Sequence, residues 1–158
     1  MLIVGCGCRG QALARELAAA GHAVRGTTRG PARVGEIEAA GAEAVVADPD
    51  RIGTIMLQLG GVSVVCWLLG SAGENSAAAL HGPRLRTLLE RLVDTPVRGV
   101  VYEAAGTVEP ALLAAGASAV REAAAIWRIP VEVIETGPAD HEAWLEAMTA
   151  AVGRLLER

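Results

Sequence analysis

Three glycines near the N-terminus have the spacing of a turn that can bind a diphosphate. Gly5, Gly7 and Gly10 follow the aliphatic run 2–4 and precede an Ala- and Leu-rich stretch, residues 11–20. This order predicts a strand, a tight turn and a helix. In such a unit the first glycine permits the turn, the second lets the backbone approach a diphosphate, and the third lets the helix pack on the strand. Free N–H groups at the helix N-terminus would then bind the anion.

A glycine pattern alone can also be a structural turn in an unrelated α/β protein. Here the flanking residues favour a dinucleotide site. Ala14 and Leu17 supply an apolar helix face, Gly21 is placed to end the helix, and Ala23-Val24 begins a second extended run. Cys6, Cys8 and Arg9 occupy the intervening loop positions and are therefore candidate site residues.

The segment after the second predicted strand bears on which nucleotide binds. NAD-specific units usually place Asp or Glu about 20 residues past the glycine loop, to bind the ribose 2′-hydroxyl. Residues 25–29 read Arg-Gly-Thr-Thr-Arg and contain no carboxylate. Thr27, Thr28 and Arg29 could bind a 2′-phosphate, Arg29 as a bidentate donor, and Arg9 could add a second positive charge. This pattern favours NADP over NAD, and Arg25 and Arg33 are interpreted as ordinary solvated arginines.

The three cysteines, Cys6, Cys8 and Cys66, are an odd number, which argues against a disulfide framework. Cys6 and Cys8 could form a redox-sensitive or metal-binding pair, with Cys66 joining from a neighbouring strand. The favoured alternative is that they are small side chains filling tight positions in the loop. No histidine stands nearby to complete a zinc site, so no metal is expected.

Composition bounds the remaining possibilities. The chain has 158 residues, 52% of them hydrophobic, and a net charge of −4, so we expect a single domain over 1–158 without nucleic-acid binding. All 14 basic residues are Arg, and the absence of Lys excludes a P-loop or a lysine Schiff base. No membrane span and no leader ahead of the first strand are evident, and we expect a cytoplasmic protein.

Six strands are expected to alternate with helices, giving an α/β fold with a doubly wound parallel sheet of order 3-2-1-4-5-6. The run 62–69 is the most apolar and should be central. Pro110 to Trp127 should be a helix broken near Gly116, and Asp140 should cap a last helix whose Trp144 packs on the sheet. The other predicted strands are 2–4, 22–26, 42–47, 98–103 and 131–135, and the other predicted helices are 11–20, 30–40, 51–59, 74–80 and 83–93.

This topology predicts where a ligand binds. The carboxyl ends of the first and fourth strands flank the switch point of the sheet, so loops 5–10 and 70–73 should face each other, with residues 103–107 at the same rim. Asp48, after the third strand, could accept a hydrogen bond from the adenine amino group or could be the N-cap of the next helix. Both interpretations are open.

The pattern resembles the extended and atypical short-chain dehydrogenases, the NAD(P)-dependent epimerase/dehydratase-like group. The resemblance spans nearly the whole chain and rests on residues 5–10, 21–29, 47–50, 61–65, 100–102 and 136–138. It implies an NAD(P)-binding Rossmann fold. By resemblance, Gly5, Gly7 and Gly10 would bind the diphosphate, Thr28 and Arg29 the 2′-phosphate, Asp48 the adenine, and Gly70 and Ser71 the region near the nicotinamide ribose.

The catalytic pair of those enzymes is missing. They carry Tyr-x-x-x-Lys, in which Lys lowers the pKa of Tyr so that it acts as a general acid/base. This chain has no Lys, its one Tyr, Tyr102, falls inside a predicted strand, and the family's C-terminal substrate lobe is largely absent. Catalytic residues therefore stay unassigned. The remaining titratable candidates are Glu74, His81, Glu103 and His141, and we favour a structural explanation for each. Glu103 would be an ordinary rim carboxylate and Glu74 a helix-start charge, whereas His81 would be a polar residue before a helix and His141 a surface residue of a first helical turn.

Three functions fit these patterns. The first is an NADP(H)-binding protein of the short-chain dehydrogenase/epimerase type, an oxidoreductase with divergent catalytic residues. Its small-molecule substrate could bind at a homodimer interface. The alternative is a catalytically silent NAD(P)-sensing or regulatory module. The third, an S-adenosylmethionine methyltransferase, is disfavoured because no acidic residue follows the second strand.

Overall fold

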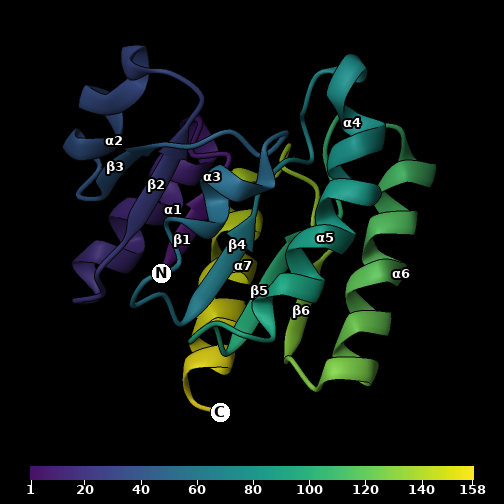
Figure 1. The fold of residues 1–158 in the computed structure, drawn as a ribbon. Coiled ribbons are helices and arrows are strands. Elements are labelled where there is room, and N and C mark those ends of the chain that lie inside the picture. The colour runs from purple at the N-terminus through teal and green to yellow at the C-terminus, as the bar shows by residue number, and fades with distance from the viewer.

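A computed structural model describes residues 1–158 and contains one parallel sheet with the strand order β3-β2-β1-β4-β5-β6 (Figure 1). This is the predicted α/β, doubly wound topology, which is therefore confirmed. The strands are β1 (Leu2–Val4), β2 (Arg25–Thr28), β3 (Glu43–Val46), β4 (Val64–Trp67), β5 (Gly99–Glu103) and β6 (Val131–Ile134).

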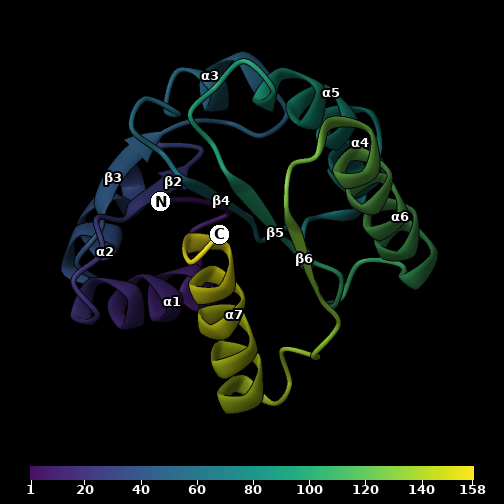
Figure 2. The same cartoon turned by 90° about the horizontal axis from the view of Figure 1, so that it is seen from below.

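Helices cover both faces of the sheet, as Figure 2 shows, and each face has its own apolar core. One face carries α1, α2 and α7, and the other carries α3, α4, α5 and α6. None of the helices combines the length and apolar character that a membrane span needs. The helices are α1 (Cys8–Ala19), α2 (Val34–Ala39) after a short 3₁₀ turn (Pro31–Arg33), α3 (Ile52–Met56), α4 (Glu74–Leu80), α5 (Pro83–Leu92), α6 (Pro110–Trp127) and α7 (His141–Leu156).

The middle strands are the most buried, as expected for strands packed on both faces. All four residues of β4 are buried between β1 and β5. Val4 of β1 pairs with Trp67 of β4, and Trp67 pairs with Tyr102 of β5. This register brings the carboxyl ends of the three strands to one edge, so the loops that follow them meet there.

The prediction for the second strand was wrong by about three residues. The sequence suggested 22–26, whereas β2 is Arg25–Thr28. Gly21 follows the end of α1 and has a φ of +87°. Residues 22–24 then lead back to the sheet, where Arg25 is the first residue of β2 that pairs with β1, opposite Leu2. The shift matters because it makes Thr27 and Thr28 part of the strand end itself.

The predicted break at Gly116 was also wrong, because α6 runs unbroken from Pro110 to Trp127. A Cβ at Gly116 would overlap the Tyr102 hydroxyl, so glycine lets the helix pack closely on β5. The final helix agrees with expectation. The Asp140 carboxylate accepts a hydrogen bond from the N–H of Ala143, and Trp144 is fully buried against the sheet.

Candidate functional site

The glycine loop has the geometry of a backbone anion site. Gly5 has a φ of +85°, and a Cβ there would overlap the Leu68 carbonyl oxygen. A Cβ at Gly10 would lie 3.0 Å from the Gly5 carbonyl oxygen, so only glycine lets α1 approach β1 this closely. Gly7 is the N-cap of α1, with no side-chain cap and no acidic residue in the first turn. The N–H groups of that turn therefore remain available to an anion.

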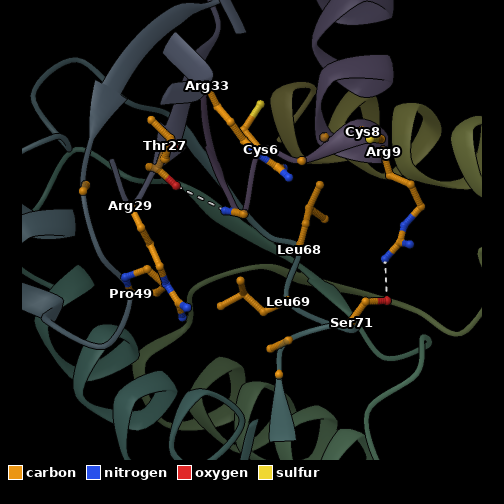
Figure 3. A pocket seen from close by; sticks show the side chains of 17 residues that line it. Cys6, Cys8, Arg9, Thr27, Arg29, Arg33, Pro49, Leu68, Leu69 and Ser71 are labelled. Carbon is orange, nitrogen blue, oxygen red and sulfur yellow. Dashed lines mark hydrogen bonds between the residues drawn. The ribbon is translucent and has the colours of Figure 1, made fainter. Parts of the chain in front are cut away.

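A cavity of about 540 Å³ lies above this loop (Figure 3). The two loops that the topology placed opposite each other both line it. Of the predicted site residues, all but Asp48 and Gly70 belong to the lining, which consists of Gly5, Cys6, Gly7, Cys8, Arg9, Gly10, Thr27, Thr28, Arg29, Arg33, Ala47, Pro49, Leu68, Leu69, Ser71, Ala72 and Gly73.

A second cavity, of about 830 Å³, lies further along the same edge. It is formed by the loops after β5 and β6 and by the first turns of α6, including Ala104–Val108, Pro110, Leu113 and Pro138. Arg9 and Ser71 line both cavities, and the Arg9 Nη2 donates to the Ser71 Oγ at 3.1 Å. The two hollows are therefore neighbours with one shared wall.

The fold resembles those of several solved enzymes, two of them in complex with a nicotinamide dinucleotide. UDP-glucuronic acid 4-epimerase from Bacillus cereus, in complex with NAD, matches with a TM-score of 0.65 and 14% identity over 86% of this chain and 56% of that one. Triphenylmethane reductase from Citrobacter sp., complexed with NADP(H), matches with a TM-score of 0.66 and 18% identity over 84% and 47%. Serine dehydrogenase from Escherichia coli gives 0.66 and 16% identity over 93% and 88%.

This chain has a Rossmann fold. The resemblance predicted from the sequence is thus confirmed at the level of the fold. The chain spans about half the length of the epimerase and of the triphenylmethane reductase. No protein-family model matches the sequence, and no curated protein matches it either.

At the carboxyl end of β2, the groups expected to bind a 2′-phosphate already have partners within the protein. Thr27 accepts a hydrogen bond from the N–H of Gly5, and Thr28 donates to the Gly30 carbonyl. The Arg29 guanidinium is paired with two carboxylates, Asp48 at 3.4 Å and Asp50 at 3.1 Å. A phosphate would have to compete with these carboxylates for Arg29.

Arg33 is the residue that sequence reasoning missed here. It was interpreted as an ordinary solvated arginine, yet it lines the cavity, and its Nη1 lies 3.5 Å from the position of a Cβ on Gly7 (Figure 3). Arg33 makes no ion pair. The one signal in the sequence was its position just after Gly30-Pro31, at the start of the helix predicted to follow the second strand.

Two predicted site residues lie outside the cavity linings and have structural roles. The Asp48 carboxylate accepts the N–H of Asp50 at 3.0 Å, whereas α3 begins at Ile52 without a side-chain cap. The N-cap interpretation of Asp48 was therefore wrong. Gly70 is buried, and its N–H donates to the Glu103 Oε2 at 2.9 Å.

Glu103 is not a rim carboxylate, because its side chain is fully buried. Its Oε1 accepts from the Arg9 Nη2 at 3.2 Å and from the Trp144 Nε1 at 3.1 Å. Burial raises the pKa of Glu103, while Arg9 and the hydrogen bonds from Gly70, Arg9 and Trp144 oppose that rise. The second positive charge expected of Arg9 is therefore compensated, and it lies between the two cavities, on the Ser71 side of the loop.

None of the four catalytic candidates lines either cavity. His81 is buried between the Tyr102 hydroxyl, 2.7 Å from Nδ1, and the Leu69 carbonyl, 3.0 Å from Nε2, and burial lowers its pKa. The Tyr102 hydroxyl is buried too, and burial raises its pKa far above the ordinary value. Glu74 and His141 are exposed, and His141 stacks on Trp144.

The cysteine side chains differ in environment. Cys6 and Cys66 are buried, and burial raises their thiol pKa to about 11 and about 12. The Cys6 sulfur packs against Gly26, where a Cβ would meet it at 2.7 Å, so it fills a tight position in the loop. Cys8 is exposed at the start of α1. The structure contains no group of three or more His, Cys, Asp or Glu side chains that could bind a metal ion.

Proposed function

We propose that this chain binds NADP(H) at the carboxyl edge of its sheet, as a protein of the short-chain dehydrogenase/epimerase type with divergent catalytic residues. The observation that carries the proposal is the cavity over the first turn of α1, which is built from bare glycine backbone and has no acidic side chain in its lining. A diphosphate fits such a place, since N–H groups and the helix dipole both favour negative charge.

The remaining parts of the dinucleotide have matching surfaces. Arg29 and Pro49 line the β2 side of the cavity, where adenosine and a 2′-phosphate would lie, and Arg33 lies over Gly7, beside the diphosphate position. The second cavity lies beyond Arg9 and Ser71, and its small apolar side chains suit the nicotinamide ring and a small substrate. Bound nicotinamide supplies hydride transfer. This chain's own residues supply binding, orientation and exclusion of water.

A catalytically silent sensor of NAD(P) is the second candidate, and one observation favours it. Neither cavity lining contains a His, a Tyr or a Lys, and Glu135 is the one carboxylate in either lining. Glu135 is exposed and paired with Arg121 at 3.1 Å. No obvious proton donor therefore faces the place where a substrate would react.

Thermal unfolding with NADPH, NADH and S-adenosylmethionine tests the proposal. A ligand that binds only the native state, at a free concentration of 100 times its Kd, stabilises the protein by about 2.7 kcal/mol. This corresponds to a rise in Tm of roughly 5–10 °C for a chain of this size. We expect that shift with NADPH, a smaller one with NADH, and none with S-adenosylmethionine. Absence of a shift with both nicotinamide nucleotides would refute the proposal. Turnover of a panel of carbonyl compounds with NADPH then separates enzyme from sensor.

A further inference from the structure

Arg9 is the one charged side chain that the two cavities share. It is the second residue of α1, and it lines the cavity in which the diphosphate would lie. One nitrogen, Nη2, makes both of its hydrogen bonds, to Ser71 and to Glu103. The guanidinium carbon also lies 5.7 Å from the centre of the Trp144 ring. The positive charge that Arg9 presents to a ligand therefore depends on whether Glu103 is ionised.

Glu103 reaches no ligand itself, because it is fully buried and lines neither cavity. Arg9 is its sole ion-pair partner. Two further donors, the N–H of Gly70 and the indole of Trp144, fix the carboxylate from the loop after β4 and from α7. A carboxylate held in this way can act on the cavity only through Arg9.

We propose that Glu103 is a positioning residue that controls the charge of Arg9 available to a nucleotide. When Glu103 is ionised, it compensates Arg9 and keeps the guanidinium on the Ser71 side. When Glu103 takes up a proton, Arg9 becomes an uncompensated cation beside the first turn of α1, and phosphate groups bind more tightly. This inference rests on the proposed function, since it concerns the same nucleotide site.

Several charged or titratable side chains lie around Glu103. Arg9 faces it from α1, and Trp144 faces it from α7, with His141 stacked on the indole ring. Tyr102 precedes it in β5 and is bonded to the buried His81. Of these groups, His141 is the exposed imidazole, so it needs a control of its own.

The test is calorimetric titration with ADP-ribose from about pH 8 to about pH 5, because its diphosphate keeps a constant charge over that range while a carboxyl group with a raised pKa takes up a proton as the pH falls. We expect wild-type affinity to rise on the order of tenfold as the pH falls, the size expected when one charge a few ångströms from the phosphates is removed. Glu103→Gln should bind about tenfold more tightly than wild type at pH 8, and with little dependence on pH. Damage to the fold would weaken binding instead.

Further variants keep the inference testable if Glu103→Gln does not fold. Trp144→Phe removes the indole N–H from the carboxylate, which raises the pKa of Glu103, so the rise in affinity should move to higher pH. Arg9→Gln should weaken binding and abolish the rise, whereas His141→Gln should keep it. An Arg9→Gln profile that still rises, or a Trp144→Phe profile unchanged from wild type, would overturn the inference.

Failure of this inference is distinguishable from failure of the proposed function. If wild type binds no ADP-ribose at any pH, the nucleotide site itself is refuted. If it binds, but Glu103→Gln and wild type show parallel pH profiles or the variant binds more weakly at pH 8, the nucleotide site survives and the role of Glu103 does not.

Discussion

Replacing Arg33 by Gln tests how the glycine loop would bind a diphosphate. The Arg33 guanidinium lies above Gly7, makes no ion pair and is exposed to solvent. A diphosphate on the first turn of α1 would therefore come close to it. Since NADPH and NADH share the diphosphate, we expect the substitution to weaken both equally.

The size of the effect follows from exposure and distance. At about 4 Å, two unit charges attract by about 1 kcal/mol in water and about 4 kcal/mol near a protein surface. Arg33 is exposed, so an intermediate value of about 2–2.5 kcal/mol applies, and ordering the long side chain costs roughly 1 kcal/mol of it. The remaining 1–1.5 kcal/mol or so corresponds to about a tenfold loss of affinity.

Isothermal titration of both nucleotides at constant ionic strength measures this loss, with Arg15→Gln as the matched control. Arg15 is an exposed arginine of α1 that lies outside both cavity linings, and its replacement changes the net charge of the protein by the same amount as Arg33→Gln does. Wild-type affinity for both nucleotides in Arg33→Gln would refute the reasoning. A loss of affinity confined to NADPH would instead assign the 2′-phosphate site to Arg33.

Three more substitutions give distinct outcomes. Asp50→Asn should free Arg29 from one of its carboxylates and raise NADPH affinity about threefold without changing NADH affinity, and an equal effect on both would contradict a 2′-phosphate site at Arg29. Gly116→Ala should lower the free energy of unfolding by about 2–3 kcal/mol in urea, because the new methyl group overlaps the Tyr102 hydroxyl; no change would show that α6 shifts freely. Because burial raises the pKa of Glu103, the native protein binds the carboxyl proton more tightly than the unfolded chain does. The free energy of unfolding of the wild type should therefore decrease as the pH rises through this pKa. Urea unfolding of Glu103→Gln should lack that decrease, and identical slopes would contradict it.

The sequence was sufficient for features set by local pattern. Strand order and the meeting of loops 5–10 and 70–73 follow from βα alternation and from the chirality of the crossovers. The Asp140 cap follows from local hydrogen bonding. The glycine turn before α1 followed from glycine spacing, because Gly10 meets the nearby Gly5 carbonyl and Gly5 has a positive φ. The helix begins at Cys8, three residues before its predicted start.

Features set by distant residues were not predictable. Glu103 looked like a rim carboxylate because nothing near it in sequence reveals that Arg9, Gly70 and Trp144 converge on it. The break assigned to Gly116 ignored the Tyr102 ring that the glycine accommodates. The pairing of Arg29 with Asp48 and Asp50 depends on how β2 and β3 align, which is a property of the folded sheet.

The bond between Glu103 and Trp144 has a consequence for how the protein matures on the ribosome. The glycine loop is synthesised before α7, because it lies far upstream of α7 in the chain. Domains acquire structure as units while translation proceeds from the N-terminus. Since the arginine beside the loop is held by a carboxylate that α7 helps to fix, a nascent chain lacking α7 would carry the loop without its finished support. The charge that Arg9 offers a nucleotide would then reach its final setting only after α7 has been synthesised and has docked.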